Sequence, residues 1–540
     1  NKNLIMRIFA LALILISAFN SVEAQSLNFG SVNEKTIKKD TAFYTISGPS
    51  NPQWIYVMLM EQKPYEGVKL LYDSIQSMGG TNVVVAIPLE FAPKQNMPYL
   101  GLLTVESKNS LIGTYKLSGQ GVFSNTYYSS TQNKSAEVLK TTLKTITGQG
   151  YKSLGYSIAR DNMYASIDNV GGNVECVYTG KKAKFNTRSG ANSASFNCEH
   201  TFPQGFFSSA APMKSDIHHL FPTTTTSNSR RGNDPFGLVS SPSWSDGGSK
   251  SGGGKFEPRD VHKGTVARSM LYFGVRYGDY SGHLAGQESL LRSWVNQFPV
   301  SSKDIKRNND IFSLQKNRNP FVDYPQFLER ISSITGTASD AKITSFEWSK
   351  SLRHQSGDTA SGWSEVRSHI IYNTGNTNVT IDEVFISGTN NSNKVLKGRN
   401  GVVLKPNESF EIEVELGADF VDGGWYESKD SLIIKTNITG QKRLAFLHAL
   451  WFDTGSSLTE YDSENNLNVF PNPVLDNLYL DLGEITSPAQ IRILDLQGKT
   501  VWIQSKNLEQ VDVNALPSGE YLIRIEDEKG LVKSARFLKY

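Results

Sequence analysis

Side chains suited to acid–base and metal chemistry are concentrated between residues 197 and 237. Glu199 and His200 are adjacent there, Asn228 follows, and three of the chain's eight histidines fall within the stretch. Carboxylate and amide oxygens are ligands that hard divalent cations prefer. An imidazole that titrates near neutrality can take a proton from water. These residue types together are what metal-assisted hydrolysis of a phosphodiester requires.

The elements that must position these side chains can be predicted from periodicity. Residues 195–198 have the pattern of a strand that enters the Glu199–His200 pair, and residues 174–178 form a second strand-like run. Helical spacing of apolar residues occurs over 135–147, 157–167 and 263–277. The Gly/Ser-rich stretch 246–254 is typical of a flexible loop.

Length and composition favour a folded, exported chain of several domains. The 540 residues carry a net charge of +3 and are 38% hydrophobic, and domains usually hold about 100–200 residues each. Residues 1–24 resemble a secretory signal peptide, with Arg7 before the apolar run 8–19 and a cleavage pattern at Val22–Ala24. No other stretch reaches the roughly 18 apolar residues of a spanning helix. We therefore expect a secreted monomer without a stable membrane span.

The chain has two cysteines, Cys176 and Cys198. Disulfides form and persist in exported proteins, so the pair predicts one disulfide bond. Two buried free thiols are the alternative.

The regions on either side of the polar cluster have β patterning. Residues 25–122 and 340–453 contain short β-branched runs separated by turn residues, which is typical of sandwiches. The order of their motifs (Phe-Gly-x-Val, Phe-x-Pro and Leu-Ser-Gly-x-Gly in the first) resembles immunoglobulin-like domains related to those of ciliary and spindle proteins. That resemblance implies adhesion or spacing and carries no catalytic group.

The last 75 residues form a third β unit, 466–540. Pro471-Asn472-Pro473, an Asp-x-x-Gly-Lys turn at 495–499 and a Leu-x-x-Gly-x-Tyr run at 516–521 occur in order. The tail closely resembles the C-terminal sorting domain of the type IX secretion system. This implies a β-sandwich that is recognised by that machinery during passage across the outer membrane.

The central segment, expected over residues 123–335, resembles the endonuclease I family of secreted nucleases. Four ordered blocks carry the resemblance: Cys198–Pro203, Asp216–Pro222 with Asn228 and Arg231, Gly264–Arg268, and Gln315–Phe321. The resemblance implies an α+β domain of the ββα-metal (His-Me finger) class. It also implies His200 as general base, with Glu199 and Asn228 holding one divalent ion. Mg²⁺ suits such a site, and Mn²⁺ or Ca²⁺ remain open.

Other polar residues of these blocks have two interpretations each. Arg231 could clamp a phosphate, because guanidinium binds such oxygens bidentately, or it could pack its helix. Asp216 and His218 could support the site from behind, and Asp216 could instead cap a turn. Arg268 remains open as a phosphate contact. Asn317 and Asn319 belong to a turn expected to lie beside the site.

The charge distribution agrees with a polyanionic substrate. Residues 127–335 hold 25 basic and 16 acidic side chains, a net charge of +9. Neutralising phosphates releases counterions and drives binding. We therefore expect a non-specific endonuclease that acts on DNA, with RNA open as a second substrate; the family resemblance implies that it leaves 5′-phosphate ends. The alternative is a surface adhesin or nucleic-acid-binding protein whose nuclease-like domain is inactive; a metal-dependent phosphatase is a third reading.

Overall fold

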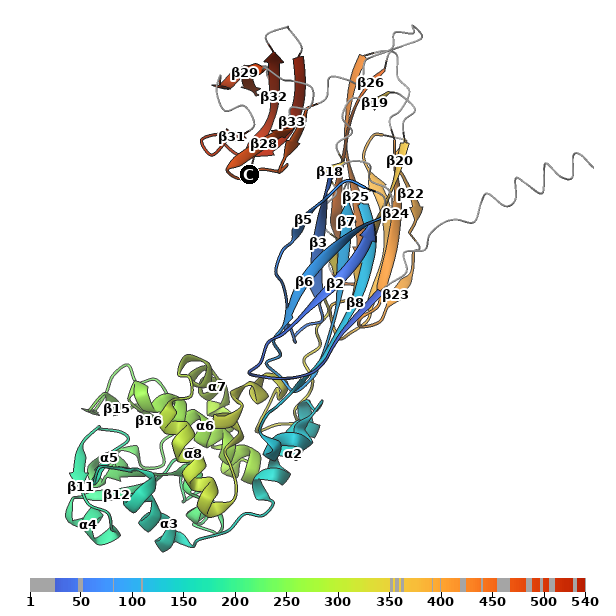
Figure 1. Cartoon of the computed structure of the whole chain (residues 1–540). Helices are drawn as coiled ribbons and strands as arrows, with labels where there is room; N and C mark the ends of the chain where they lie inside the picture. Colours follow the sequence, from blue (N-terminus) through green and yellow to red (C-terminus); the bar gives the residue numbers. More distant parts are fainter. Residues whose placement is uncertain are drawn as a thin grey trace, which may run out of the picture. The chain divides into compact units, whose positions relative to one another are not determined.

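The structure is a computed structural model of the chain (Figure 1). It describes residues 25–46, 52–80, 82–107, 110–349, 353–354, 359–360, 364–390, 392–398, 400–417, 424–438, 440–453, 467–481, 488–495, 499–504, 510–527 and 532–539. The expected signal peptide, residues 1–24, lies outside the described residues. Among the described helices, none combines the length and apolar character needed to cross a membrane.

The chain divides into two compact units. One comprises residues 1–420 and 426–451, and the other residues 421–425 and 452–540. The first contains the central helical segment and two β regions, and the second is the C-terminal β region.

The N-terminal β region consists of two sheets that share one apolar core. One sheet has the order β1-β8-β7-β3-β5 and the other β2-β6-β4. The strands are β1 (Gln25–Asn33), β2 (Lys38–Ile46), β3 (Gln53–Glu61), β4 (Val68–Leu70), β5 (Ser74–Ser77), β6 (Val83–Phe91), β7 (Pro98–Ser107) and β8 (Ser110–Val122). Alternate residues such as Val85, Ile87 and Leu89 on β6 point into the core. The predicted β character of residues 25–122 is confirmed.

The central segment is built around the buried helix α6 (Asp260–Tyr277), on which fourteen residues are buried. Its apolar core is a single cluster that runs from Phe123 to Ala338. The other helices are α2 (Ala136–Gly148), α3 (Tyr156–Asn162), α4 (Arg188–Ser193), α5 (Thr225–Arg231), α7 (Glu288–Gln297), α8 (Ser302–Gln315) and α9 (Pro320–Asp323). The three helices predicted over 135–147, 157–167 and 263–277 are confirmed, the second ending in a π-helical turn over Met163–Ile167.

Three small antiparallel sheets accompany these helices. The strands are β9 (Asn169–Val170), β10 (Asn173–Glu175) and β11 (Lys182–Lys184) in the first, β12 (Phe196–His200) and β13 (Leu220–Thr224) in the second, and β14 (Trp244–Asp246), β15 (Ser249–Gly252) and β16 (Lys255–Glu257) in the third. The strand predicted over 195–198 is confirmed as β12. The run 174–178 is a strand only as far as Glu175.

The flexible loop predicted over 246–254 is wrong. This stretch is the ordered β14–β15–β16 meander, in which Ser249 is fully buried. Gly247 and Gly248 form the first turn with φ of 58° and 94°, and Gly253 and Gly254 form the second with φ of 61° and 69°. Two-residue hairpin turns require such positive φ values, which glycine adopts without a steric cost. The glycines therefore specify two tight hairpins here.

The second β region also consists of two sheets around one core. One has the order β17-β20-β24-β22, and the other β18-β26-β25-β21-β23 with β19 paired to β26. The strands are β17 (Glu347–Trp348), β18 (Arg353–His354), β19 (Thr359–Ala360), β20 (Ser364–Tyr372), β21 (Val379–Ser387), β22 (Lys394–Lys397), β23 (Val402–Leu404), β24 (Ser409–Gly417), β25 (Gly424–Thr436) and β26 (Gly440–Asp453).

The C-terminal unit has two sheets, with the orders β27-β28-β31 and β30-β29-β32-β33. Their strands are β27 (Asn468–Phe470), β28 (Asn477–Asp481), β29 (Pro488–Leu494), β30 (Thr500–Gln504), β31 (Gln510–Asp512), β32 (Gly519–Asp527) and β33 (Val532–Lys539). Leu478, Ile491 and Ile523 lie in a core of their own. The tail is therefore a separate β unit, as the sequence predicts.

Candidate active site

Two strands and a helix bring the predicted chemical groups together. β12 and β13 are antiparallel, with Glu199 opposite Phe221 and His200 opposite Leu220. α5 follows β13 directly, and the Thr224 hydroxyl caps it by accepting a hydrogen bond from the Ser227 N–H. The threonine run before Asn228 thus begins a regular helix, because a threonine at this position satisfies a free backbone N–H.

A polar pocket of about 230 Å³ lies between β12 and α5. Its lining residues are Cys198, Glu199, His200, Pro203, Gln204, Asn228, Arg231, Gly232 and Asn233. Asn228 and Arg231 are three residues apart on α5 and therefore lie on one face of the helix. The block that contains Glu199 and His200 and the block that contains Asn228 and Arg231 are about 30 residues apart in the sequence, and they meet at this pocket.

The Glu199 carboxylate is held from one side only. Its Oε1 accepts a hydrogen bond from the Tyr178 hydroxyl at 2.8 Å and forms an ion pair with the Arg231 Nε at 3.1 Å. Among the described residues, its Oε2 has no hydrogen-bond partner. Burial raises the pKa of Glu199, while Arg231 and the Tyr178 hydroxyl oppose that shift. The carboxylate is thus fixed in orientation, with one oxygen available to a ligand in the pocket.

Asn228 is partly buried, and its side-chain amide makes no hydrogen bond to any residue that the structure describes. A pocket-facing amide oxygen beside a carboxylate oxygen is a donor set that suits a hard cation. The two side chains therefore fit a divalent ion held through two protein oxygens, with its other ligands supplied by water and substrate.

His200 is oriented by the protein backbone. Its Nε2 lies 3.1 Å from the Lys214 carbonyl oxygen, and a carbonyl can only accept, so Nε2 carries the hydrogen. Burial, together with the neighbouring His219, lowers the pKa of His200 to about 3. The ring is therefore neutral at physiological pH, with a lone pair on Nδ1.

The Arg231 guanidinium is directed at protein groups. Besides Glu199, it donates to the Thr201 carbonyl at 2.5 Å and to the Gly232 carbonyl at 3.0 Å. Its side chain is 1% exposed. This geometry favours the helix-packing interpretation of Arg231 over the phosphate clamp, since it ties α5 to the strand that carries Glu199.

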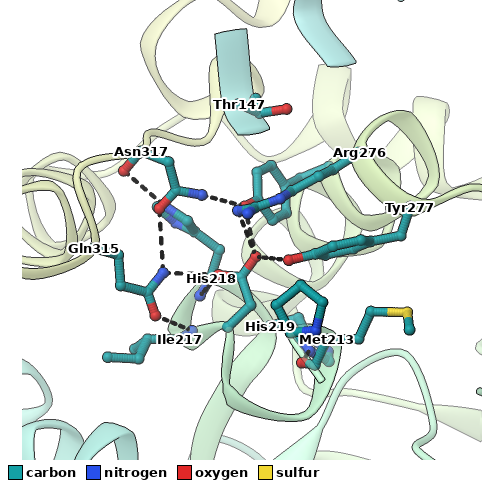
Figure 2. A network of polar contacts seen from close by, with 12 residues as sticks. Thr147, Met213, Ile217, His218, His219, Arg276, Tyr277, Gln315 and Asn317 are labelled. Carbon is teal, nitrogen blue, oxygen red and sulfur yellow. Dashed lines mark hydrogen bonds and ion pairs between the residues drawn. The ribbon is translucent and has the colours of Figure 1, made fainter. Parts of the chain in front are cut away.

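Asp216 and His218 belong to a second polar network, in which Arg276, Tyr277, Gln315 and Asn317 converge (Figure 2). The Asp216 side chain caps the short helix Ile217–His219, as one sequence interpretation expected. His218 Nε2 lies 3.1 Å from the Asn317 carbonyl oxygen, so these two residues are in contact. Neither of them lines the pocket.

Arg268 and Asn319 are also engaged by the protein. Arg268 is 2% exposed, pairs with Asp304 at 3.1 Å and donates to the Phe298 carbonyl. The Asn319 side chain caps α9 and donates to the Arg268 carbonyl. These contacts hold α6, α8 and α9 together, and Arg268 does not line the pocket.

The predicted disulfide is wrong: Cys176 and Cys198 are both buried free thiols. The Cys176 sulfur contacts the Thr223 and Ser227 hydroxyls at 3.6 and 3.5 Å, at the start of α5. Cys198 lies on β12 and lines the pocket. Each sulfur therefore has its own packing environment. Export favours disulfides in general, but it does not determine whether two particular cysteines lie close enough to bond.

Two groups of the site were missed from the sequence. Tyr178 holds Glu199, and it is itself positioned by the buried Ser249, whose hydroxyl donates to the Tyr178 carbonyl at 2.7 Å. The aromatic end of the strand-like run 174–178 was the available signal. The role of the Lys214 carbonyl could not be predicted from the sequence, because every residue type has the same backbone carbonyl.

Comparisons with known proteins match the segment that contains this pocket. The endonuclease I family model matches residues 128–326, and the model of a secretion-system C-terminal sorting domain matches residues 468–539. An extracellular ribonuclease of Bacillus amyloliquefaciens is 34% identical over 226 residues, which are 38% of this chain and 78% of that protein. An extracellular ribonuclease of Bacillus subtilis (strain 168) is 33% identical over 226 residues, with the same shares.

An extracellular deoxyribonuclease of Aeromonas hydrophila is 30% identical over 123 residues, which are 21% of this chain and 50% of that protein. The region shared with the ribonucleases spans most of their length, and the family model covers the segment that holds the pocket. The chain belongs to the endonuclease I family and is a secreted endonuclease with a type IX sorting domain at its C-terminus.

Proposed function

We propose that this endonuclease hydrolyses phosphodiester bonds in DNA and RNA with His200 as general base and one divalent ion held by Glu199 and Asn228. The observation that carries the proposal is the pocket itself. It brings together a neutral imidazole, an unshared carboxylate oxygen and an unbonded amide. Relatives named as ribonucleases and as a deoxyribonuclease support both polymers as substrates.

The chain's own groups have distinct tasks in this mechanism. His200 Nδ1 takes a proton from water while the water oxygen attacks phosphorus, and the bond to the 3′ oxygen breaks to leave a 5′-phosphate. The backbone carbonyl of Lys214 keeps the hydrogen of the His200 ring on Nε2, so that Nδ1 stays the accepting atom. Arg231 and Tyr178 hold Glu199 in place. A divalent ion, on which the family generally depends, would stabilise charge on the phosphate and on the departing oxygen; Mg²⁺ is our candidate.

The structural class and domain limits are part of the same proposal. The β12–β13–α5 arrangement supports assignment to the ββα-metal class, and the apolar core from Phe123 to Ala338 supports a catalytic domain over about residues 123–335. The paired sheets of the two β regions, 25–122 and 340–453, support immunoglobulin-like sandwiches.

Plasmid digestion tests this function. The purified segment 25–465 should convert supercoiled plasmid first to nicked and then to short DNA in Mg²⁺, and should leave it intact with EDTA. Ribosomal RNA incubated in parallel measures the preference between the polymers, and analysis of end groups should detect 5′-phosphates. Cleavage that continues undiminished in EDTA would contradict the metal-dependent mechanism.

Removal of the sorting domain should separate export from catalysis. Because residues 468–539 match a sorting domain and fold around their own core, deletion of 466–540 should leave nuclease activity unchanged. The truncated protein should accumulate inside the outer membrane of a bacterium with type IX secretion. Fractionation and activity assays of culture medium and periplasm measure both effects. Normal amounts of active truncated enzyme in the medium would show that the tail is not the export signal.

A further inference from the structure

Two cations share one aromatic ring next to the base. Tyr156, at the start of α3, lies beside His200 with ring centroids 5.4 Å apart and an interplanar angle of 31°. The Arg160 guanidinium carbon lies 4.1 Å from the centre of the Tyr156 ring, and the Lys214 ammonium nitrogen lies 5.2 Å from it. Arg160 is one helical turn after Tyr156, and Lys214 comes from the short helix Met213–Ser215.

Neither cation has an anionic partner among the described residues. Arg160 and Lys214 form no ion pair there, their side chains make no hydrogen bond, and the Arg160 Nε is buried without a partner. The nearest carboxylate in sequence, Asp161, is paired with Arg188. Among the other arginines of the central segment, Arg230 and Arg330 also form no ion pair with a described residue. The remaining eight are paired with carboxylates: Arg188, Arg231, Arg259, Arg268, Arg276, Arg292, Arg307 and Arg318.

Two unneutralised positive charges held around one ring repel each other, so their arrangement favours an anion from outside the chain. The ring fixes the cations by cation–π contact, which reduces the entropy lost when a ligand binds. Guanidinium and ammonium groups both form strong charge-assisted hydrogen bonds with phosphate oxygens. Both residues are partly exposed, so a ligand can reach them.

We propose that Arg160 and Lys214 form a subsite for a nucleic-acid phosphate that neighbours the one being cleaved. The inference rests on the proposed function and extends it. His200 lines the catalytic pocket and also packs on Tyr156, so the two cations lie just beyond the base and outside the pocket lining. Phosphates in one strand follow each other at about 3.4 Å along the duplex axis. A strand with one phosphate in the pocket therefore brings a neighbour toward this pair.

The test measures binding separately from cleavage. A fluorescent DNA duplex is titrated with the 25–465 segment in EDTA at several salt concentrations, and anisotropy gives Kd. The variants are Arg160→Gln, Lys214→Gln and the double variant. Arg160→Lys and Lys214→Arg keep the charge. Lys306→Gln, on an exposed ion pair with Asp310, removes one positive charge elsewhere and serves as the control.

Each neutralising variant should raise Kd by about tenfold and reduce the slope of log K against log salt by about 0.9. The double variant should lose about twice that slope, while the charge-keeping variants and Lys306→Gln stay near wild type. Unchanged slopes in Arg160→Gln and Lys214→Gln overturn the subsite, even when cleavage falls, because that pattern means the cluster only supports His200. If the wild-type segment neither binds DNA nor cuts it in Mg²⁺, the proposed function fails instead, so the two failures are distinguishable.

Discussion

His200→Ala is expected to lower the rate of plasmid cleavage by about 10²–10⁴-fold, which is the usual contribution of a positioned general base. The variant should keep its fold, its Mg²⁺ affinity and its salt-dependent affinity for DNA, because Glu199 and Asn228 are the proposed holders of the ion. Single-turnover cleavage, calorimetric titration with Mg²⁺ and binding in EDTA measure these three quantities.

Two further variants show whether this effect is specific. Glu199→Ala should weaken Mg²⁺ binding, which His200→Ala should not. His283→Ala removes a half-buried imidazole that does not line the pocket, and should cut within a few-fold of wild type. If His200→Ala retains a near wild-type rate, His200 is not the base, and the mechanism must be abandoned whatever the family assignment.

The largest effect on stability is expected from Asp216→Ala. This fully buried carboxylate accepts hydrogen bonds from Gln315, the His218 N–H, Tyr272, Tyr277 and Arg276. Without it, the 5% exposed Arg276 would keep a buried charge with no carboxylate. Breaking a buried pair in this way usually costs about 3–5 kcal/mol. Thermal unfolding of the central segment should therefore begin at least several degrees lower.

The matched control for this loss is Asp161→Ala. Asp161 pairs with Arg188, and both side chains are well exposed, so its removal should change stability by less than about 1 kcal/mol. Arg276→Met in the Asp216→Ala background should recover part of the loss, because it removes the unpaired charge. Equal unfolding temperatures for Asp216→Ala and wild type would contradict a stabilising role for the network.

The stability difference should also depend on pH. Burial alone would raise the pKa of Asp216, but Arg276 and the surrounding donors hold it well below its usual range. A carboxyl with a lowered folded-state pKa contributes its stability above the unfolded-state value, about 3.9 for Asp. That contribution is lost as pH falls from there toward the folded-state pKa. The gap between wild type and Asp216→Ala should therefore be full near pH 7 and narrow below about pH 4.

The sequence predicted the main elements and the three groups of the catalytic proposal. Periodicity located α2 and α6, and these helix predictions succeed because they depend on local pattern. Residue types and the family resemblance singled out Glu199, His200 and Asn228, which line one pocket and whose roles stay a prediction.

Apart from the stretch 246–254, where turn glycines predicted a flexible loop, the errors concern side chains whose partners come from distant parts of the chain. An arginine binds carboxylates and phosphates through the same planar fork, so residue type could not tell Arg268, paired with Asp304, from a substrate contact. The disulfide failed for a related reason. Whether Cys176 faces Cys198 depends on the packing of α5, which no spacing rule encodes.

The hydrogen bond from His200 to the Lys214 carbonyl has an evolutionary consequence. Every amino acid presents the same main-chain oxygen, so substitutions at position 214 need not disturb the tautomer of the proposed base. Natural selection can then vary that side chain in response to the polymers a bacterium encounters, while the proposed proton abstraction is preserved. If a side-chain carboxylate or amide at this position accepted the hydrogen bond instead, one side chain would determine both the tautomer of His200 and the contact with the polymer. A substitution that changed the contact would then also disturb the tautomer.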